Sequence, residues 1–361
     1  MAKYHRLIRI FIFFSVDGSL KLNRHLYDRS SSFMVTALSE TALITGSTDG
    51  IGVTTARNIL IGNNDVNNVL IHGRDEKRIA AATASIQKSV ANRKIKNLSS
   101  ESKTTRQVAV GLPVSDLSTV GGCYDLANSV IEFCRDDVSE ESSLKILMNN
   151  AGVYSKDLVR TRDGLELTFA VNVLAPFVVT SMLLPILLAN GSRDSGKCNI
   201  KGSRIVIASS ISQSWKLSRD YWDDPQYHKR SYCAHGAYSE SKLLDAMLTI
   251  EMADRLKNAG IHTSVLTCNC LDPGTVNTKM LLDGWGAIGI DVADALDESW
   301  CCTSPDLDGI SGEYFVGRSR RHASKCAYDS FHREKLWQTL SDLAPTAAAE
   351  WDRAIQKYST K

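Results

Sequence analysis

The chain has 361 residues, of which 43% are hydrophobic, and its 42 Lys and Arg nearly balance 40 Asp and Glu, leaving a net charge of +2. This length and apolar content suffice for an ordinary packed core, whereas so small a net charge creates no global field that would favour nucleic acid as a partner. The balanced charge instead suggests a small-molecule partner. Nine cysteines, an odd number without a Cys-x-x-Cys motif, do not suit a full disulfide framework, so we expect a reducing compartment.

Residues 1–40 form an N-terminal extension that holds an apolar run over Leu7–Val16, interrupted by Arg9. The run is too short to span a bilayer, and no small-residue cleavage site follows it cleanly. An interfacial anchor, with peripheral membrane contact through residues 1–20, or a helix docked on the domain is favoured over a cleaved signal peptide. We expect the protein to lie in the cytoplasm or on the cytoplasmic face of an internal membrane, and the sequence leaves N-terminal targeting open.

From Thr41 onward, short β-rich runs alternate with longer segments of helical spacing, which is typical of a parallel sheet covered by helices on both faces. We therefore predict an α/β protein with a doubly wound parallel sheet of about seven strands, a Rossmann fold, in one domain over 41–344 followed by a tail over 345–361. The strands are predicted at Thr41–Thr45, Asn68–His72, Gln107–Leu112, Lys145–Met148, Arg204–Ala208, His262–Thr267 and Glu313–Val316.

Two segments between these strands stand out. Asn97–Arg106 is polar and Ser/Thr-rich and is predicted to be a surface insertion. Leu165–Leu188 is predicted to be a long apolar helix, and Pro176 and Pro185 should bend it or limit its extent because each removes a backbone donor.

The first strand runs into a glycine-rich loop, Thr45-Gly46-Ser47-Thr48-Asp49-Gly50-Ile51-Gly52. Bare backbone at Gly46, Gly50 and Gly52 lets a pyrophosphate approach, and the N-terminus of the following helix stabilises its charge. A second strand about twenty residues further on is what the dinucleotide-binding fold requires. The loop therefore predicts a dinucleotide site rather than a simple turn.

The end of the second strand, His72-Gly73-Arg74, bears on which dinucleotide is bound. Enzymes that prefer NAD place a carboxylate at the position of Gly73, and it would repel a 2′-phosphate. Arg74 offers that phosphate a charge-assisted contact, the alternative being a solvated arginine paired with Asp75. We predict NADP(H) in preference to NAD(H).

Tyr238 and Lys242 stand four residues apart, on one face of a predicted helix. An ammonium near a phenol favours the phenolate and lowers the phenol pKa toward neutrality, so the pair can transfer a proton. The other motifs follow the fourth and fifth strands and the tyrosine helix: Asn149-Asn150-Ala151-Gly152, Ser209-Ser210 and Pro273-Gly274-Thr275-Val276-Asn277-Thr278.

In this order, the motifs resemble the short-chain dehydrogenase/reductase family from about Thr41 to about Ala344. The long loop between Ser210 and Tyr238 and the tail Ser-Gly-Glu-Tyr-Phe-Val resemble most the retinol-dehydrogenase and WW-domain-oxidoreductase subgroup. The resemblance implies an alcohol dehydrogenase or carbonyl reductase in which Tyr238 supplies the proton and Lys242 bonds the nicotinamide ribose.

The resemblance also implies that Ser210 donates a hydrogen bond to the substrate oxygen, with Ser209 as the alternative. It implies that Asn172 holds a proton-relay water, the alternative being a purely structural buried amide. Asp116 is implied to bond the adenine amino group, although the residues alone equally suggest a helix cap. The cofactor-binding residues are thus expected to be Gly46, Ser47, Asp49, Gly50, Ile51, Gly52, Arg74, Asp116, Asn150, Ala151, Gly152, Tyr238, Lys242, Pro273, Gly274, Val276 and Thr278.

The subgroup implies an apolar substrate, a retinoid-, steroid- or lipid-like alcohol or carbonyl. The alternatives are a broad-specificity reductase of small carbonyls and a dinucleotide-binding scaffold without turnover, although scaffolds usually lose the tyrosine, lysine or serine. The aromatic-rich loop before Tyr238 either lines a pocket or packs on the surface, and Leu281–Ile290 lies where the family places its substrate lid. A C-terminal helix over 331–343 suggests core packing or a subunit contact, so a homo-oligomer stays open, and the eight histidines show no metal-ligand spacing.

Overall fold

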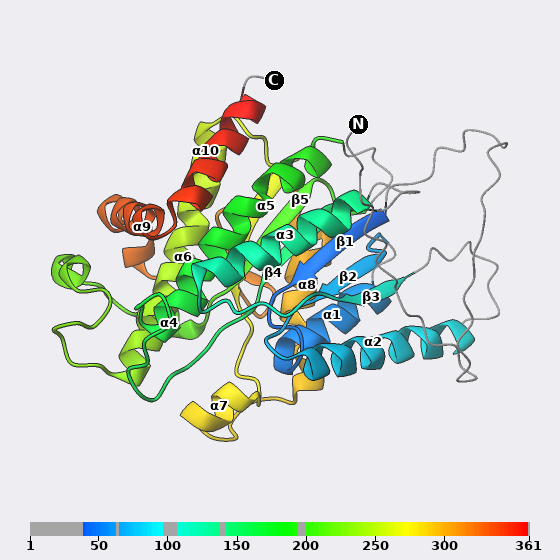
Figure 1. The fold of residues 1–361 in the computed structure, drawn as a ribbon, viewed down its shortest axis with the longest axis horizontal. Coiled ribbons are helices and arrows are strands. Elements are labelled where there is room, and N and C mark those ends of the chain that lie inside the picture. The colour runs from blue at the N-terminus through cyan, green and yellow to red at the C-terminus, as the bar shows by residue number, and fades with distance from the viewer. Residues whose placement is uncertain (1–38, 63–64, 97–106, 137–141, 194–198, 360–361) are drawn as a thin grey trace, which may run out of the picture. The chain divides into compact units, whose positions relative to one another are not determined.

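Strands from along the described chain form one sheet in the order β3-β2-β1-β4-β5-β6-β7-β8 (Figure 1). The computed structural model describes residues 39–62, 65–96, 107–136, 142–193 and 199–359, so the apolar run at Leu7–Val16 and the insertion predicted at Asn97–Arg106 lie outside it. The strands are β1 Ser39–Ile44, β2 Asn68–Ile71, β3 Val108–Gly111, β4 Ser142–Asn149, β5 Ser203–Ala208, β6 Leu266–Asp272, β7 Tyr314–Val316 and β8 Ser319–Arg321.

The pairing confirms the predicted doubly wound sheet. Every pair from β3 to β7 is parallel, and β8 adds an antiparallel edge strand to the seven that were predicted. Each residue of β2, β5 and β6 is buried, as expected for parallel strands with helices on both faces.

Helices cover the sheet on two sides. The long ones are α1 Gly50–Gly62, α2 Glu76–Lys96, α3 Val120–Asp136, α5 Ala175–Gly191, α6 Ala234–Asn258, α9 Ser330–Leu343 and α10 Pro345–Ser359, and the short ones are α4 Leu167–Phe169, α7 Lys279–Gly284 and α8 Asp297–Thr303. One apolar core joins the sheet to α3, α5, α6, α9 and α10, and a second joins it to α1, α2 and α8. Figure 1 shows α3 and α5 together on one side of the sheet.

The predicted apolar helix at Leu165–Leu188 is divided in the structure. A π-helical turn, Ala170–Leu174, lies between α4 and α5. Pro176 explains the division, because it lacks the amide that an α-helix would use to bond the Asn172 carbonyl. The span Leu167–Gly191 is long and apolar enough to cross a membrane, but 83% of its most apolar window is buried inside the protein, where it forms part of the core.

Most predicted strand ends lie within three residues of the observed ones, but the sixth strand and the end of the domain differ by more. The sixth strand is Leu266–Asp272 rather than His262–Thr267, because Asn269 is satisfied inside the sheet: it donates to the Ile310 carbonyl at 2.7 Å and accepts from the Glu313 amide at 3.0 Å. The predicted tail beyond Ala344 continues the domain as α10, in which Trp351 is 1% exposed and packs against Trp337 of α9.

Candidate active site

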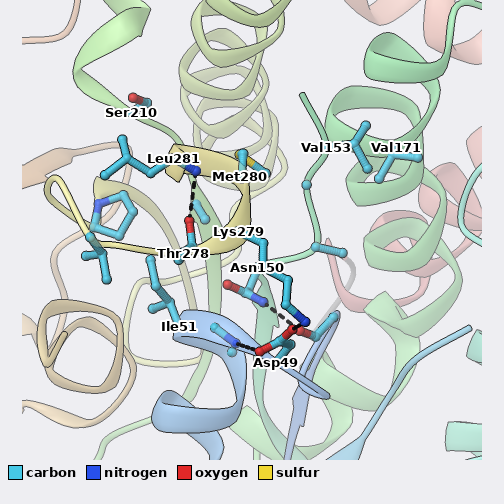
Figure 2. A pocket seen from close by; sticks show the side chains of 18 of the residues that line it. Asp49, Ile51, Asn150, Val153, Val171, Ser210, Thr278, Lys279, Met280 and Leu281 are labelled. Atoms are coloured by element: carbon cyan, nitrogen blue, oxygen red, sulfur yellow. Dashed lines mark hydrogen bonds and ion pairs between the residues drawn. The ribbon is translucent and has the colours of Figure 1, made fainter. Parts of the chain in front are cut away.

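The carboxyl ends of the strands open onto a cleft of about 760 Å³ (Figure 2). This edge is where ligands bind in open α/β sheets. Of the residues expected to form the site, the cleft is lined by Gly46, Asp49, Gly50, Ile51, Gly52, Arg74, Asp116, Asn150, Ala151, Gly152, Ser210, Tyr238, Lys242, Pro273, Gly274, Val276 and Thr278. The fold therefore brings together motifs that are separated by more than two hundred residues of sequence.

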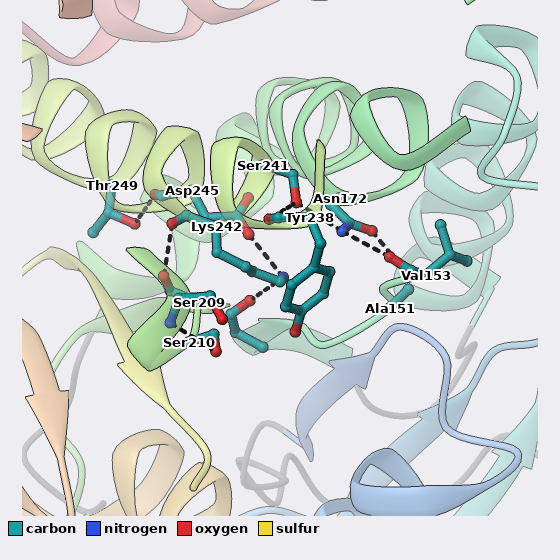
Figure 3. A network of polar contacts seen from close by, with 12 residues as sticks. Ala151, Val153, Asn172, Ser209, Ser210, Tyr238, Ser241, Lys242, Asp245 and Thr249 are labelled. Carbon is teal, nitrogen blue, oxygen red and sulfur yellow. Dashed lines mark hydrogen bonds and ion pairs between the residues drawn. The ribbon is translucent and has the colours of Figure 1, made fainter. Parts of the chain in front are cut away.

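Two of the expected residues do not line the cleft. Ser47 is fully buried behind the glycine loop, where its hydroxyl donates to the Ile44 carbonyl and accepts from the His72 amide. Asn172 is 1% exposed, and its amide bonds both backbone groups of Val153 and the Ser241 hydroxyl (Figure 3). These contacts support the structural interpretation of the Asn172 side chain, which ties the π-helical turn to α6 and to the strand-end loop.

The backbone conformation and close packing of the glycine loop explain its glycines. Gly46 and Gly50 adopt φ values of +65° and +57°, which glycine adopts without strain. A Cβ on Gly52 would lie 2.4 Å from the Asn150 side-chain nitrogen and 2.6 Å from the Gly46 carbonyl oxygen, so no side chain fits between the loop and β4. Asn150 in turn donates to the Thr45 carbonyl at 2.7 Å and holds the loop in place.

His72, at the end of β2, supports the same loop. Its Nδ1 accepts from the Gly46 amide at 2.9 Å, and its Nε2 lies 3.3 Å from the Ser115 carbonyl. These contacts fit the neutral imidazole with the proton on Nε2. Burial lowers the pKa of His72 from 6.5 to about 4.

Stability should depend on pH through His72. Its pKa is lower in the folded protein than in the unfolded chain, so the unfolded state binds the extra proton, and stability is lost as pH falls from about 6.5 toward 4. Replacing His72 with Asn keeps an acceptor for the Gly46 amide and removes the titration. We expect the wild type to lose about 2 kcal/mol more unfolding free energy than His72→Asn between about pH 7 and pH 5. Urea denaturation of both proteins measures this, and parallel losses would contradict it.

The glycine loop carries one negative charge, the Asp49 carboxylate, and two cations from other elements pair with it. Its carboxylate lies 2.5 Å from Lys279 Nζ of α7 and 2.9 Å from an Arg78 guanidinium nitrogen of α2. The hydrogen bond from Lys279 outweighs partial burial, so the pKa of Asp49 is lowered. Sequence reasoning missed Lys279 and Arg78, since only the folded chain brings them beside the loop.

Gly73 and Arg74 line the cleft just beyond the end of β2. A Cβ on Gly73 would lie 2.5 Å from Thr48 Cγ2, so a carboxylate there would require the Thr48 side chain to shift. Arg74 is exposed and lines the cleft, while Asp75 accepts from the Arg78 amide at 2.8 Å. Asp116 also lines the cleft, and its side chain accepts from the Ser118 amide at 3.1 Å in the turn before α3. The first turn of α3 is bonded by Thr119 instead, whose hydroxyl accepts from the Gly122 amide at 3.1 Å, so Asp116 is not the helix cap.

Tyr238 and Lys242 project from the first turns of α6 to the floor of the cleft (Figure 3). Lys242 Nζ lies 5.7 Å from the centroid of the Tyr238 ring. Burial raises the pKa of Tyr238, and Lys242 and a hydrogen bond with Ser210 oppose that rise without cancelling it. The net direction in this structure is therefore opposite to the lowering expected from the lysine alone.

The two serines after β5 have different surroundings. Ser209 is 2% exposed, and its hydroxyl donates to the Lys242 carbonyl at 2.8 Å, which fixes β5 to α6. Ser210 is less buried and accepts from the Ser212 amide. The Ser210 side chain also forms a hydrogen bond with Tyr238, so of the two serines it is the one that lies beside the phenol.

An aromatic cluster stands over Tyr238. The Trp285 ring lies 5.5 Å from Tyr238, 4.8 Å from Tyr154 and 5.0 Å from His235, measured between centroids. Trp285 follows α7 in the predicted lid segment, but nothing in the sequence brought Tyr154 and His235 to notice. The aromatic residues of the preceding loop pack elsewhere, and the cleft contains none of Trp215, Tyr221, Trp222, Tyr227 and Tyr232.

Two buried carboxylates near Lys242 also escaped sequence reasoning. Asp245 is fully buried one turn beyond Lys242 on α6, and Glu298 of α8 is 1% exposed, lines the cleft and accepts from the Thr55 hydroxyl at 2.9 Å. Burial raises the pKa of each carboxyl to about 7. The sequence signal for Asp245 was its spacing, since residues three apart share a helix face.

Comparison with known proteins identifies relatives along most of the chain, although no family model matches. Retinol dehydrogenase 14 of Homo sapiens is 29% identical over 320 residues, which cover 82% of this chain and 84% of the relative. Polyprenol dehydrogenase of Danio rerio is 29% identical over 349 residues, with 91% and 94% covered.

Solved structures share the fold. A 7α-hydroxysteroid dehydrogenase complexed with NADH and 7-oxo glycochenodeoxycholic acid superposes with a TM-score of 0.54 at 18% identity, covering 77% of this chain and 92% of that one. A gluconate 5-dehydrogenase of Burkholderia cenocepacia in complex with NADP and tartrate has the same TM-score and identity, covering 78% and 94%.

The chain thus has a cleft at the carboxyl edge of a parallel sheet and a buried tyrosine–lysine pair in that cleft. Its sequence is similar to dehydrogenases over most of its length. Neighbours of the same fold bind either NADH or NADP, which supports a nicotinamide coenzyme without deciding between the two. The protein is an oxidoreductase of the short-chain dehydrogenase/reductase family, related to retinol dehydrogenases and polyprenol dehydrogenase.

Proposed function

We propose that the protein interconverts an apolar alcohol and its carbonyl with NADP(H) as coenzyme. The observation that carries the proposal is that Ser210, Tyr238 and Lys242 line one cleft together with the glycine loop. Relatives named for retinol and polyprenol, both apolar alcohols, support the substrate class. So do the exposed apolar side chains at the cleft mouth, among them Trp285 and Ile288.

The cleft fits a dinucleotide. The positive φ angles of the glycine loop, the absence of space for a side chain on Gly52 and the cations around the loop suit a pyrophosphate. The bound coenzyme supplies or accepts a hydride. Gly46, Gly50 and Gly52 would hold the pyrophosphate, Arg74 would bind the 2′-phosphate, and Lys242 would bond the ribose of the nicotinamide half.

The protein residues handle the substrate oxygen and its proton. Carbonyl reduction builds negative charge on that oxygen, which has to be stabilised and protonated. Ser210 donates a hydrogen bond to it and holds it beside Tyr238, and the Tyr238 hydroxyl transfers its proton to it. Alcohol oxidation uses the same groups in reverse, with Tyr238 as the phenolate that accepts the proton.

The test is NADPH oxidation with retinal, a long-chain polyprenal, steroid ketones, aliphatic aldehydes and small quinones, each with wild type and Tyr238→Phe. Turnover of the apolar carbonyls that is lost in the variant supports the proposal. Turnover confined to small quinones and short aldehydes would instead establish a broad carbonyl reductase. Coenzyme binding without turnover across the panel would contradict an enzymatic role on these substrates and favour a scaffold.

Coenzyme preference should depend on Arg74. We expect Arg74→Asp to reduce the preference for NADPH over NADH, measured as the ratio of dissociation constants, by at least about 30-fold, because a charge-assisted hydrogen bond to phosphate is replaced by repulsion. Arg93→Asp is the control. Arg93 lies in α2, the helix that follows Arg74, and does not line the cleft, so the same change of charge there should leave the ratio unchanged. An Arg74→Asp protein with the wild-type ratio would rule out the NADP(H) assignment.

A further inference from the structure

A carboxylate without an assigned role lies directly behind the proposed catalytic lysine. Asp245 Oδ2 is 2.9 Å from Lys242 Nζ, and Asp245 is 0% exposed (Figure 3). The other carboxylate oxygen, Oδ1, is buried and has no hydrogen-bond partner in the described structure. A buried carboxylate with one unsatisfied oxygen is costly, so this aspartate is held at the lysine at the expense of stability.

The ammonium is held by two protein oxygens. Lys242 Nζ donates to Asp245 at 2.9 Å and to the Ala208 carbonyl of β5 at 2.7 Å. An ammonium has three N–H donors, so one remains for a group in the cleft that Lys242 lines. Asp245 thus fixes where the lysine points and which donors it can offer.

The pair also determines how much positive charge Tyr238 experiences. An ionised Asp245 beside a protonated Lys242 leaves no net charge, whereas a neutral side chain at position 245 leaves the full charge of the ammonium near the phenol. Lys242 acts to lower the pKa of Tyr238 and Asp245 acts to raise it. Because burial raises the pKa of Asp245 to about 7, the charge of the pair changes close to neutral pH.

Other titratable groups face this pair from the neighbouring elements. Cys270 and Asp272 come from β6, and Glu298 comes from α8. The pKa of Cys270 is raised far above its usual value by burial, so its thiol stays neutral. Asp272 acts on Tyr238 and Glu298 acts on Lys242, both as negative charges. Only Asp245 forms an ion pair with the lysine among the described residues.

We propose that Asp245 is a positioning residue that balances the charge of Lys242 and thereby sets the pH at which Tyr238 exchanges its proton. The inference rests on the proposed function, in which Tyr238 is the acid and base. With Asp245 ionised, the phenol keeps its proton to higher pH, which favours carbonyl reduction. Protonation of Asp245 exposes Tyr238 to the ammonium and favours the phenolate that alcohol oxidation requires.

The decisive variant is Asp245→Asn, which keeps the size of the side chain and an acceptor for Lys242 but removes the negative charge. In the oxidation of an apolar alcohol with NADP⁺, we expect the acidic limb of the kcat/KM profile to move by about one unit toward lower pH. Thr249→Val is the control on the same helix, because Thr249 donates to the Asp245 carbonyl oxygen at 2.9 Å, lies beside the neutral Cys270 thiol and carries no charge. Its profile should coincide with that of the wild type.

A second measurement needs no turnover. The tyrosinate absorbance of the coenzyme-bound protein is titrated with and without Tyr238→Phe, and the difference gives the signal of Tyr238 alone among the 11 tyrosines of the chain. The midpoint should fall by about one unit in Asp245→Asn. Should that variant not fold, Asp245→Ser, which also removes the charge and leaves space for water, takes its place. Equal midpoints in the wild type and the charge-free variant would overturn the inference.

The two failures are distinguishable. A wild type that turns over none of the panel carbonyls would contradict the proposed function, while the absorbance titration would still decide whether Asp245 controls the proton of Tyr238. Active enzyme with an unmoved Tyr238 midpoint would leave the proposed function intact and reject the role of Asp245.

Discussion

Tyr238→Phe is expected to lower kcat/KM for carbonyl reduction about a thousandfold. The substitution removes one hydroxyl from a ring that is 9% exposed and packed against Trp285 and Tyr154, so the shape of the cleft floor is kept. What is lost is the proton donor beside the developing oxyanion, and no other phenol among the described residues lines the cleft. Coenzyme affinity, followed by protein fluorescence, should change less than about threefold because Lys242 and the glycine loop remain.

Tyr232→Phe is the matched control for this experiment. The Tyr232 hydroxyl donates to the Ser155 carbonyl at 2.8 Å and does not line the cleft. The same chemical change there should leave kcat/KM close to the wild-type value. Equal losses in the two variants would mean that the lost activity reflects general destabilisation, and an active Tyr238→Phe protein would exclude Tyr238 as the acid.

Lys242→Met is expected to lower the free energy of unfolding by about 3–5 kcal/mol near pH 8, in addition to abolishing turnover. The methionine fills much of the lysine volume, but Asp245 is then left fully buried without its cation. Without Lys242, the pKa of Asp245 rises further above its unfolded value, so the folded state binds the extra proton. The loss should therefore grow as pH rises from about 4 and be smallest in acid.

The double variant Lys242→Met/Asp245→Asn separates charge from packing. Removing both charges should recover most of the unfolding free energy lost in Lys242→Met, because a buried neutral amide costs less than a buried unpaired carboxylate. Urea denaturation of the wild type, both single variants and the double variant completes the cycle. If the double variant is no more stable than Lys242→Met, the ion pair contributes nothing and the loss comes from packing alone.

The parts of the site that follow local sequence rules were predictable. The glycine loop, Asn150, Ser210, Tyr238 and Lys242 lie at strand ends or within one helical turn, so the predicted strands placed them near one edge of a parallel sheet and the family resemblance suggested their roles. The residues that set their charge were not. Asp245 and Glu298 look like ordinary helix carboxylates in the sequence, and their effect arises from burial that only the folded chain creates.

The predicted end of the sixth strand and the predicted C-terminal tail were wrong for a related reason. The sixth strand was predicted to end at Thr267, but Asn269 and Asp272 are both buried in β6, where partners from other segments satisfy Asn269. A single tryptophan at position 351 did not indicate that the segment after Ala344 is a packed helix. In the structure Trp351 is buried against Trp337, which makes α10 part of the core rather than a tail. Polar satisfaction and helix docking are long-range properties, so propensity and periodicity do not reveal them.

The crowding at Gly73 has a consequence for how coenzyme preference can change, by design or by mutation. A side chain at position 73 would meet Thr48 Cγ2 at 2.5 Å, and Ile79 Cγ1 at 3.2 Å closes the other side. A single Gly73→Asp exchange, the direct route to an NAD-type carboxylate, therefore requires the Thr48 side chain to shift. A smaller residue at position 48 would remove that contact, so the tolerance for a carboxylate at this strand end depends on the residue at position 48.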